Sequence, residues 1–144
     1  MAKSSKESPK LEESPGGTGV NNEADRGLRI LLVEDHLDTA TLLGKLLRRF
    51  GHDVAIADCR AAALTMAASS PFDVMLSDIR LPDGTGHELM REIRERHSIP
   101  GIALTGYGME EDVSLSRDAG FFEHVVKPVN IDHLQSVLTR ATRR

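Results

Sequence analysis

Arg29-Ile30-Leu31-Leu32-Val33, followed at once by Glu34-Asp35, is a short aliphatic run that ends abruptly in two acids. A continuous apolar run of this length is typical of a strand buried on both faces of a parallel sheet. The next apolar residues recur at helical spacing from Asp38 to Phe50, and Gly51 supplies a stop signal for that helix. The stretch therefore predicts one strand–helix unit with two acids at the end of its strand.

The same strand–helix pattern repeats along the rest of the chain. Strands are expected at residues 53–57, 72–77, 99–104 and 123–126, and helices at 61–68, 86–96, 109–119 and from 131 almost to the C-terminus. The expected caps are Asp38 for the first helix, a residue near Asp58 for the second, and Asn130 or a neighbour for the last, because such side chains accept backbone N–H groups. This alternation predicts an α/β fold with right-handed crossovers, in which helices cover both faces of an open parallel sheet.

Polar side chains stand at the carboxyl ends of the predicted strands, where open α/β sheets gather their ligands. They are Glu34, Asp35, Asp78, Thr105 and Lys127. Three like charges in one cleft need a cation to stay ionised together, and an all-oxygen, partly hydrated site suits Mg²⁺. Beside such a cation Asp78 is the expected nucleophile, which would become an aspartyl phosphate. Lys127 would then pair with one phosphoryl oxygen, and the hydroxyl of Thr105 would donate to another.

The composition indicates one globular domain behind a polar leader. The chain has 144 residues, 40% of them hydrophobic, which is enough for one ordinary core. Residues 1–27 are rich in Ser, Lys, Glu, Pro and Gly, and we expect a disordered tail or linker there, acting as a flexible leader or as a functional arm. Residues 28–144 are the expected domain.

Charge and cysteine content argue against several classes of protein. A formal net charge of -4 disfavours direct binding to nucleic acid. Cys59 is the only cysteine, which excludes an intrachain disulfide framework and fits a reducing compartment, so a cytoplasmic location is expected. No apolar run approaches the roughly 18 residues of a membrane span, so no membrane insertion is expected.

Five motifs in register give the sequence a resemblance to a known family. The motifs are Glu34-Asp35, Asp78, the following Leu81-Pro82-Asp83-Gly84, Thr105, and Lys127-Pro128. In this order and spacing the chain resembles the receiver domain of two-component response regulators over Leu28 to Arg144. The resemblance implies a flavodoxin-like (βα)5 three-layer sandwich with the parallel strand order 2-1-3-4-5.

The resemblance also implies what the acids do. Asp78 would be phosphorylated by a histidine kinase or a histidine phosphotransfer protein in a Mg²⁺-dependent reaction, with Mn²⁺ as a substitute cation. Asp35 and Asp78 would bind the cation directly and Glu34 through water, while the backbone carbonyl of Arg80 would add a ligand. The domain would then be a phosphorelay signalling module that catalyses its own phosphorylation and dephosphorylation, not an enzyme acting on an external substrate.

The same resemblance implies an output surface. Thr105 and Lys127 would contact the phosphoryl group, and both lie on the last two strands. The face made by helix 109–119, strand 123–126 and the last helix would therefore change on phosphorylation and present that change to a downstream protein.

Three positions bear on the switch and on the lifetime of the signal. Strand 123–126 carries His124 where receivers often have Tyr or Phe, so imidazole would have to serve in place of the usual switching ring. Arg80 stands two residues beyond Asp78, and Tyr107 two beyond Thr105. In this family both positions tune dephosphorylation.

Two arrangements and three rival functions stay open. Residues 128–144 leave room for a last helix and for no effector domain, which fits a free-standing receiver or the end of a hybrid histidine kinase; the run 103–108 favours the hybrid kinase. An aspartyl-nucleophile phosphatase of the haloacid dehalogenase family would need a second Asp where Arg80 stands. A flavin-binding electron carrier would have its phosphate repelled by Glu34-Asp35. The third rival is a receiver-like module that is never phosphorylated.

Overall fold

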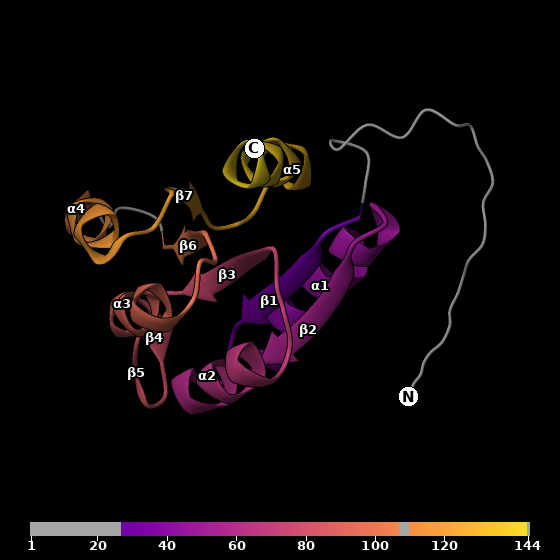
Figure 1. The fold of residues 1–144 in the computed structure, drawn as a ribbon. Helices are drawn as coiled ribbons and strands as arrows, with labels where there is room; N and C mark the ends of the chain where they lie inside the picture. The colour runs from indigo at the N-terminus through magenta and orange to yellow at the C-terminus, as the bar shows by residue number, and fades with distance from the viewer. Residues whose placement is uncertain (1–26, 107–109, 144) are drawn as a thin grey trace.

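Five parallel strands form the central sheet of the computed structural model, which describes residues 27–106 and 110–143. They are β1 (Arg29–Val33), β2 (Asp53–Ala57), β3 (Val74–Asp78), β6 (Gly101–Thr105) and β7 (Glu123–Val126). Their spatial order is β2-β1-β3-β6-β7 (Figure 1). This arrangement confirms the predicted α/β class and, counting only the sheet strands, the predicted order 2-1-3-4-5.

The register of the sheet brings the ends of β1 and β3 together. Val33, the last residue of β1, lies opposite Ala57 of β2 and Ser77 of β3. Glu34 and Asp35 follow Val33 directly, and Asp78 follows Ser77. The three acids therefore leave the sheet at the same edge.

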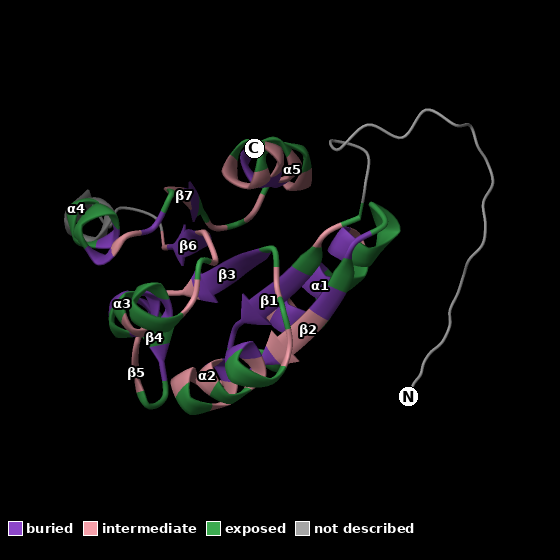
Figure 2. Cartoon of the chain, viewed as in Figure 1, coloured by how far each residue is buried: buried purple, intermediate pink, exposed green. Residues whose placement is uncertain are grey.

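Helices cover both faces of the sheet. They are α1 (Leu37–Arg49), α2 (Arg60–Ser69), α3 (Gly86–Arg96), α4 (Glu110–Ala119) and α5 (Ile131–Thr142). Alternate residues of β1 face opposite layers: Leu32 packs in one cluster with Leu47 of α1 and Leu134 of α5, and Leu31 in another with Leu89 of α3. Figure 2 shows the central strands largely in the colour of buried residues. The sandwich has three layers, as expected.

Core positions on the helices agree with the sequence pattern in part. Leu89 and Ile93 of α3, four positions apart on the helix predicted at 86–96, are fully buried. On α1, Leu47 is fully buried and Leu42 is 61% exposed, and Phe50, directly after the helix, is 44% exposed. The apolar stripe of α1 is therefore narrower than its spacing indicated.

Two strands begin later than predicted. β3 starts at Val74 and not at residue 72, and β6 starts at Gly101 and not at residue 99. The Asp73 side chain accepts the backbone N–H of Arg29 at 2.8 Å, so it links the amino-terminal ends of β1 and β3. Phe72 and Ile99 pack against the core as partly buried side chains without joining the ladder.

The predicted caps are confirmed for α5 and α2 and are wrong for α1. Asn130 caps α5 by accepting the N–H of His133 at 2.9 Å, as predicted. Asp38 is not the cap of α1, because the helix starts at Leu37 and Asp38 lies in its first turn. In α2 the cap falls one residue after Asp58, on Cys59, because that helix starts at Arg60.

A short hairpin follows Asp78, where the sequence predicted only a loop. It consists of β4 (Arg80–Leu81) and β5 (Gly84–Thr85), which pair antiparallel with Arg80 opposite Thr85. The Thr85 side chain then caps α3 by accepting the N–H of Glu88, and the Glu88 carboxylate accepts the backbone N–H of Thr85, which completes a capping box. The chain beyond Asp78 is thus fixed at both ends of the hairpin.

Some expectations fall outside the described residues. Residues 1–26 are among these, so the tail and the domain boundary near residue 28 stay predictions, as does the role of Tyr107. Within the described segments, no helix is both long and apolar enough to cross a membrane.

Candidate functional site

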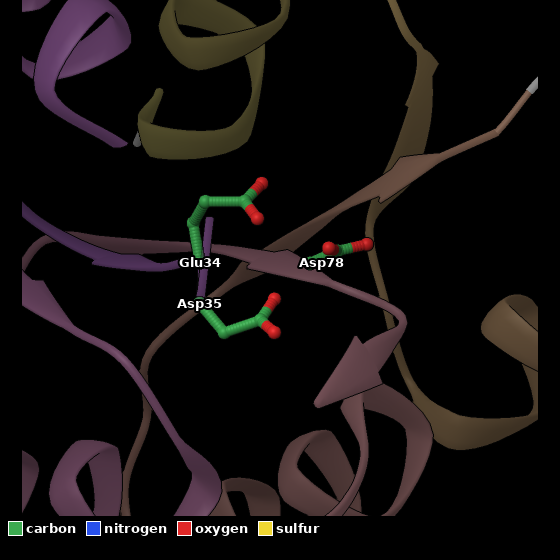
Figure 3. Close-up of side chains that lie close together, drawn as sticks. All are labelled: Glu34, Asp35 and Asp78. Atoms are coloured by element: carbon green, nitrogen blue, oxygen red, sulfur yellow. The ribbon is translucent and has the colours of Figure 1, made fainter. Parts of the chain in front are cut away.

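The structure brings the predicted acids together at the carboxyl edge of the sheet. Glu34, Asp35 and Asp78 each offer a carboxylate oxygen that lies within 4.8 Å of those of the other two. Figure 3 shows the Glu34 and Asp35 side chains extending from the end of β1 toward the side on which Asp78 lies. Glu34 is buried, Asp35 exposed and Asp78 intermediate, so the cluster runs from the interior to the surface.

Glu34 is held by hydrogen bonds on both of its oxygens. Its side chain is 1% exposed, Oε1 accepts Nζ of Lys127 at 2.8 Å, and Oε2 accepts the backbone N–H of His36 at 3.1 Å. His36 immediately precedes α1. Glu34 does not cap α1, but its carboxylate orders the approach to that helix.

Lys127 connects the last strand to the acids. Its Nζ lies 2.8 Å from Glu34 Oε1 and 3.2 Å from Asp78 Oδ2, and its backbone N–H donates to Thr105 at 2.7 Å. Burial alone lowers the pKa of Lys127, but the hydrogen bond to Glu34 and the charges of Asp78 and Glu34 outweigh burial and raise the pKa above its ordinary value. Lys127 is thus kept charged where the acids meet.

Asp78 is fixed by its own backbone and by the start of α3. Its Oδ1 accepts the N–H of Ile79 at 2.8 Å, and the carbonyl of Ile79 accepts the N–H of Gly86 at 2.7 Å. A side-chain carbon at position 86 would lie closer to the Asp78 carbonyl oxygen than van der Waals contact allows. Gly86 is therefore a site residue that the sequence reasoning missed, although a glycine at the first position of a helix was the available signal.

The other predicted residues lie around this centre. Thr105 ends β6, is 2% exposed, and stands one residue beyond Leu104, the partner of Asp78 in the ladder. Arg80 lies in β4 with its side chain exposed. His124 is half-buried in β7 opposite Ala103. Tyr107 is not among the described residues.

The donor set fits a hard divalent cation. The three acids supply only oxygen ligands, and Lys127 offsets one of their three formal negative charges, which leaves a formal charge of -3 + 1 = -2. Carboxylate oxygens with room for water are the surroundings that Mg²⁺ prefers. The site can therefore bind a cation and, through it, an anionic group such as a phosphoryl group.

Comparisons with known proteins point to one family. A family model for the response regulator receiver domain matches residues 30–139. The chain is 32% identical over 113 residues to the transcriptional regulatory protein ZraR of Escherichia coli K12, covering 78% of this chain and 26% of that protein. It is 34% identical over 133 residues to probable histidine kinase 2 of Oryza sativa subsp. indica, covering 77% of this chain and 13% of the kinase. The chain thus spans 26% of the length of the first of these relatives and 13% of the second.

A solved structure resembles both the fold and the sequence. The receiver domain of sensor histidine kinase PA1611 from Pseudomonas aeruginosa PAO1 superposes with a TM-score of 0.75 at 32% identity, covering 82% of this chain and 99% of that one. That structure holds a magnesium ion coordinated in the active site cleft.

Proposed function

The chain belongs to the response regulator receiver domain family, a family of two-component signalling modules, and on that premise we propose that Asp78 is its phosphoacceptor. The observation that carries the proposal is the convergence of Glu34, Asp35 and Asp78 within 4.8 Å, with Lys127 on two of them. Family membership displaces the phosphatase and flavin-carrier alternatives.

The reaction is a phosphoryl transfer to carboxylate oxygen. A carboxylate oxygen of Asp78 attacks the phosphorus of a phosphohistidine, the phosphorus–nitrogen bond breaks, and its electron pair stays on the imidazole, which takes a proton from water. Water later attacks the aspartyl phosphate and releases inorganic phosphate, restoring Asp78. In this sense the domain catalyses its own phosphorylation and dephosphorylation.

The residues around Asp78 prepare this transfer. Asp35, Asp78 and the backbone carbonyl of Arg80 would hold Mg²⁺ directly and Glu34 through water, with Mn²⁺ as a substitute of similar ligand preference. When bound, the cation would neutralise charge on the phosphoryl oxygens. Lys127, already 3.2 Å from Asp78 Oδ2, exchanges its contact with that carboxylate for one with a phosphoryl oxygen.

Residues at the ends of β6 and β7 transmit the effect of phosphorylation to the surface of the domain. Thr105 donates its hydroxyl to a phosphoryl oxygen, and the backbone bond from Lys127 to Thr105, 2.7 Å long, links the two strand ends that respond. His124 takes the switching position on β7, while Arg80 and Tyr107 tune hydrolysis. Leu115 of α4, 45% exposed, and Val126 of β7, 44% exposed, supply apolar surface to a downstream protein on the α4–β7–α5 face.

The phosphodonor is a histidine kinase or a histidine phosphotransfer protein. Leu37 and Leu42 are 77% and 61% exposed on α1, whose first residues follow the acid pair, so an apolar partner surface can dock beside Asp78. Similarity to the PA1611 kinase receiver and to the rice kinase favours a receiver that is part of a hybrid kinase, while a free-standing receiver stays open. A cytoplasmic location stays a prediction.

Intact-protein mass after incubation with acetyl phosphate and Mg²⁺ tests the proposal. The wild type should gain the mass of one phosphoryl group, and only when the cation is present. Asp78→Asn should gain none. The control Asp73→Asn should behave as the wild type does, because the Asp73 carboxylate lies at the amino-terminal ends of the strands, away from Asp78. Phosphorylation of Asp78→Asn to the wild-type extent would refute the assignment.

A further inference from the structure

The hairpin after Asp78 is fastened to the start of α2. Asp83, in the turn between β4 and β5, accepts the backbone N–H of Arg60 on Oδ1 at 2.7 Å and that of Ala61 on Oδ2 at 2.9 Å. One carboxylate from a distant segment thus binds two of the N–H groups that the first turn of a helix leaves free. These backbone hydrogen bonds, first that from Ala61 and then that from Arg60, lower the pKa of Asp83.

The Arg60 side chain extends the same attachment to α3. Its Nε donates to the Asp83 carbonyl at 3.3 Å, and its Nη1 forms a hydrogen-bonded ion pair with Glu92. A side-chain carbon at Gly84 would lie 3.0 Å from Arg60 Nε, so the hairpin backbone and the guanidinium are packed together. We call Arg60, Asp83 and Glu92 the hairpin clamp, because they join α2, the hairpin and α3.

The clamp acts on the segment that carries the site. Arg80, whose carbonyl is the proposed fourth ligand, pairs with Thr85 across the hairpin. Gly86 donates to the Ile79 carbonyl at 2.7 Å, and Ile79 donates to Asp78 Oδ1 at 2.8 Å. A shift of the hairpin would therefore reorient both the Asp78 carboxylate and the Arg80 carbonyl.

We propose that Asp83 and Arg60 are positioning residues, which hold Asp78 and the Arg80 carbonyl in the geometry that binds the divalent cation. This inference rests on the proposed function. Neither residue touches the cation or the phosphoryl group; both act through the hairpin. Residues that orient metal ligands commonly change metal affinity by about 10- to 100-fold when they are lost.

A purely structural role for the clamp gives a different expectation. If Asp83 only capped α2, its loss would lower global stability and leave the hairpin as it is. The chain offers a matched control in Asp73, which also uses a carboxylate to bind a backbone N–H of a distant strand, at 2.8 Å, but at the opposite edge of the sheet. Asp73→Ala removes the same kind of bond without touching the hairpin.

Two measurements by NMR on the full chain separate these roles. The first is hydrogen exchange of the Ile79 and Gly86 amides without any divalent cation, and the second is a titration with Mg²⁺ alone. For Asp83→Ala we expect exchange at both amides to rise about fivefold, the factor that corresponds to loss of a typical helix cap, and Mg²⁺ to bind about tenfold more weakly. Asp73→Ala should match the wild type in both.

A second variant keeps the test decisive where Asp83→Ala does not fold. Asp83→Asn retains one acceptor of the two, so its loss of Mg²⁺ affinity should be smaller than that of Asp83→Ala and larger than that of Asp73→Ala. If the wild type binds Mg²⁺ and the Asp83 variants bind it equally well, the positioning role is wrong and the proposed function stands. If the wild type itself binds no Mg²⁺, the proposed function fails and the inference fails with it.

Discussion

Among the residues that the structure describes, Lys127 is the one basic side chain that forms ion pairs with the acid cluster. Its Nζ reaches Glu34 at 2.8 Å and Asp78 at 3.2 Å, and Glu34 is 1% exposed on its side chain. Lys127 therefore has two tasks, since it compensates a buried carboxylate before transfer and is available to the phosphoryl group afterwards. The first task makes it a stabilising residue as well as a chemical one.

Lys127→Met should destabilise the domain at pH 9 by about 1–3 kcal/mol, because the buried Glu34 carboxylate loses its partner. The pKa of Lys127 is raised, so its ion pairs stabilise fully below the ordinary value of 10.5 and are lost as the pH rises through the raised value. Urea unfolding at pH 9 and above pH 11 should thus show a difference between wild type and variant that shrinks with pH. An equal difference in unfolding free energy at both pH values would contradict a stabilising role of the ion pairs. The control is Lys45→Met, on the exposed side of α1.

Gly86→Ala should impair the site more than the fold. The added methyl would press on the Asp78 carbonyl, so we expect a loss of about 1–3 kcal/mol from overpacking together with weak phosphorylation by acetyl phosphate. Gly51→Ala is the control, because Gly51 has φ of 93° and open space around it, so alanine there adds backbone strain far from Asp78. Normal phosphorylation of Gly86→Ala would show that the close contact does not position Asp78.

At the scale of elements, α3 and α4 are joined by a buried polar contact. His87 Nε2 and Ser116 Oγ lie 3.1 Å apart, and the two residues are 7% and 2% exposed. The imidazole also meets the edge of Phe121, with ring centroids 6.4 Å apart. This contact joins α4, the helix after Thr105, to α3, the helix after Asp78, so it connects the two helices that follow the proposed switch residues.

Ser116→Ala should loosen α4 from α3. The change leaves the buried His87 nitrogen without its partner, which costs about 1–3 kcal/mol. Amide exchange in the last turn of α4 should speed up more than in α1, which lies on the other face of the sheet. Exchange that rises equally in both helices would mean that the contact supports only global stability.

The elements were largely predictable, and the reasons differ from one to another. Strand β1 could be predicted because a strand buried on both faces is continuously apolar. Two helix ends could be predicted because Gly51 and Gly120 follow them, with positive φ of 93° and 109°. The acids, Thr105 and Lys127 were placed correctly because parallel strands share one carboxyl edge.

The misses came from contacts between distant segments. The first two N–H groups of α2 are bound by Asp83, which lies 23 and 22 positions away, so no local pattern shows this contact. The ion pair between Glu34 and Lys127 joins residues 93 positions apart, so no local pattern shows it either. The β4–β5 hairpin has two residues in each strand, which is too short for any periodicity to reveal.

For the whole molecule, Mg²⁺ should act as a stabilising ligand. A cation that binds only the folded state stabilises it by about 1.4 kcal/mol at ten times its dissociation constant, so the thermal midpoint should rise by a few degrees. Asp35→Asn should abolish the rise, while Asp53→Asn, at the amino end of β2, should retain it. A rise that persists in Asp35→Asn would place the cation elsewhere.

Under the proposed function, phosphate enters the molecule as an acyl phosphate on Asp78. Borohydride reduces an acyl phosphate to an alcohol, so trapping the phosphorylated wild-type protein and sequencing its peptides by mass spectrometry reads out the modified residue itself. The account predicts homoserine at position 78 alone, and only in samples that received both phosphodonor and Mg²⁺. Homoserine at Asp35 or at another aspartate, a reduced side chain at a glutamate, or phosphate that resists borohydride would contradict this assignment.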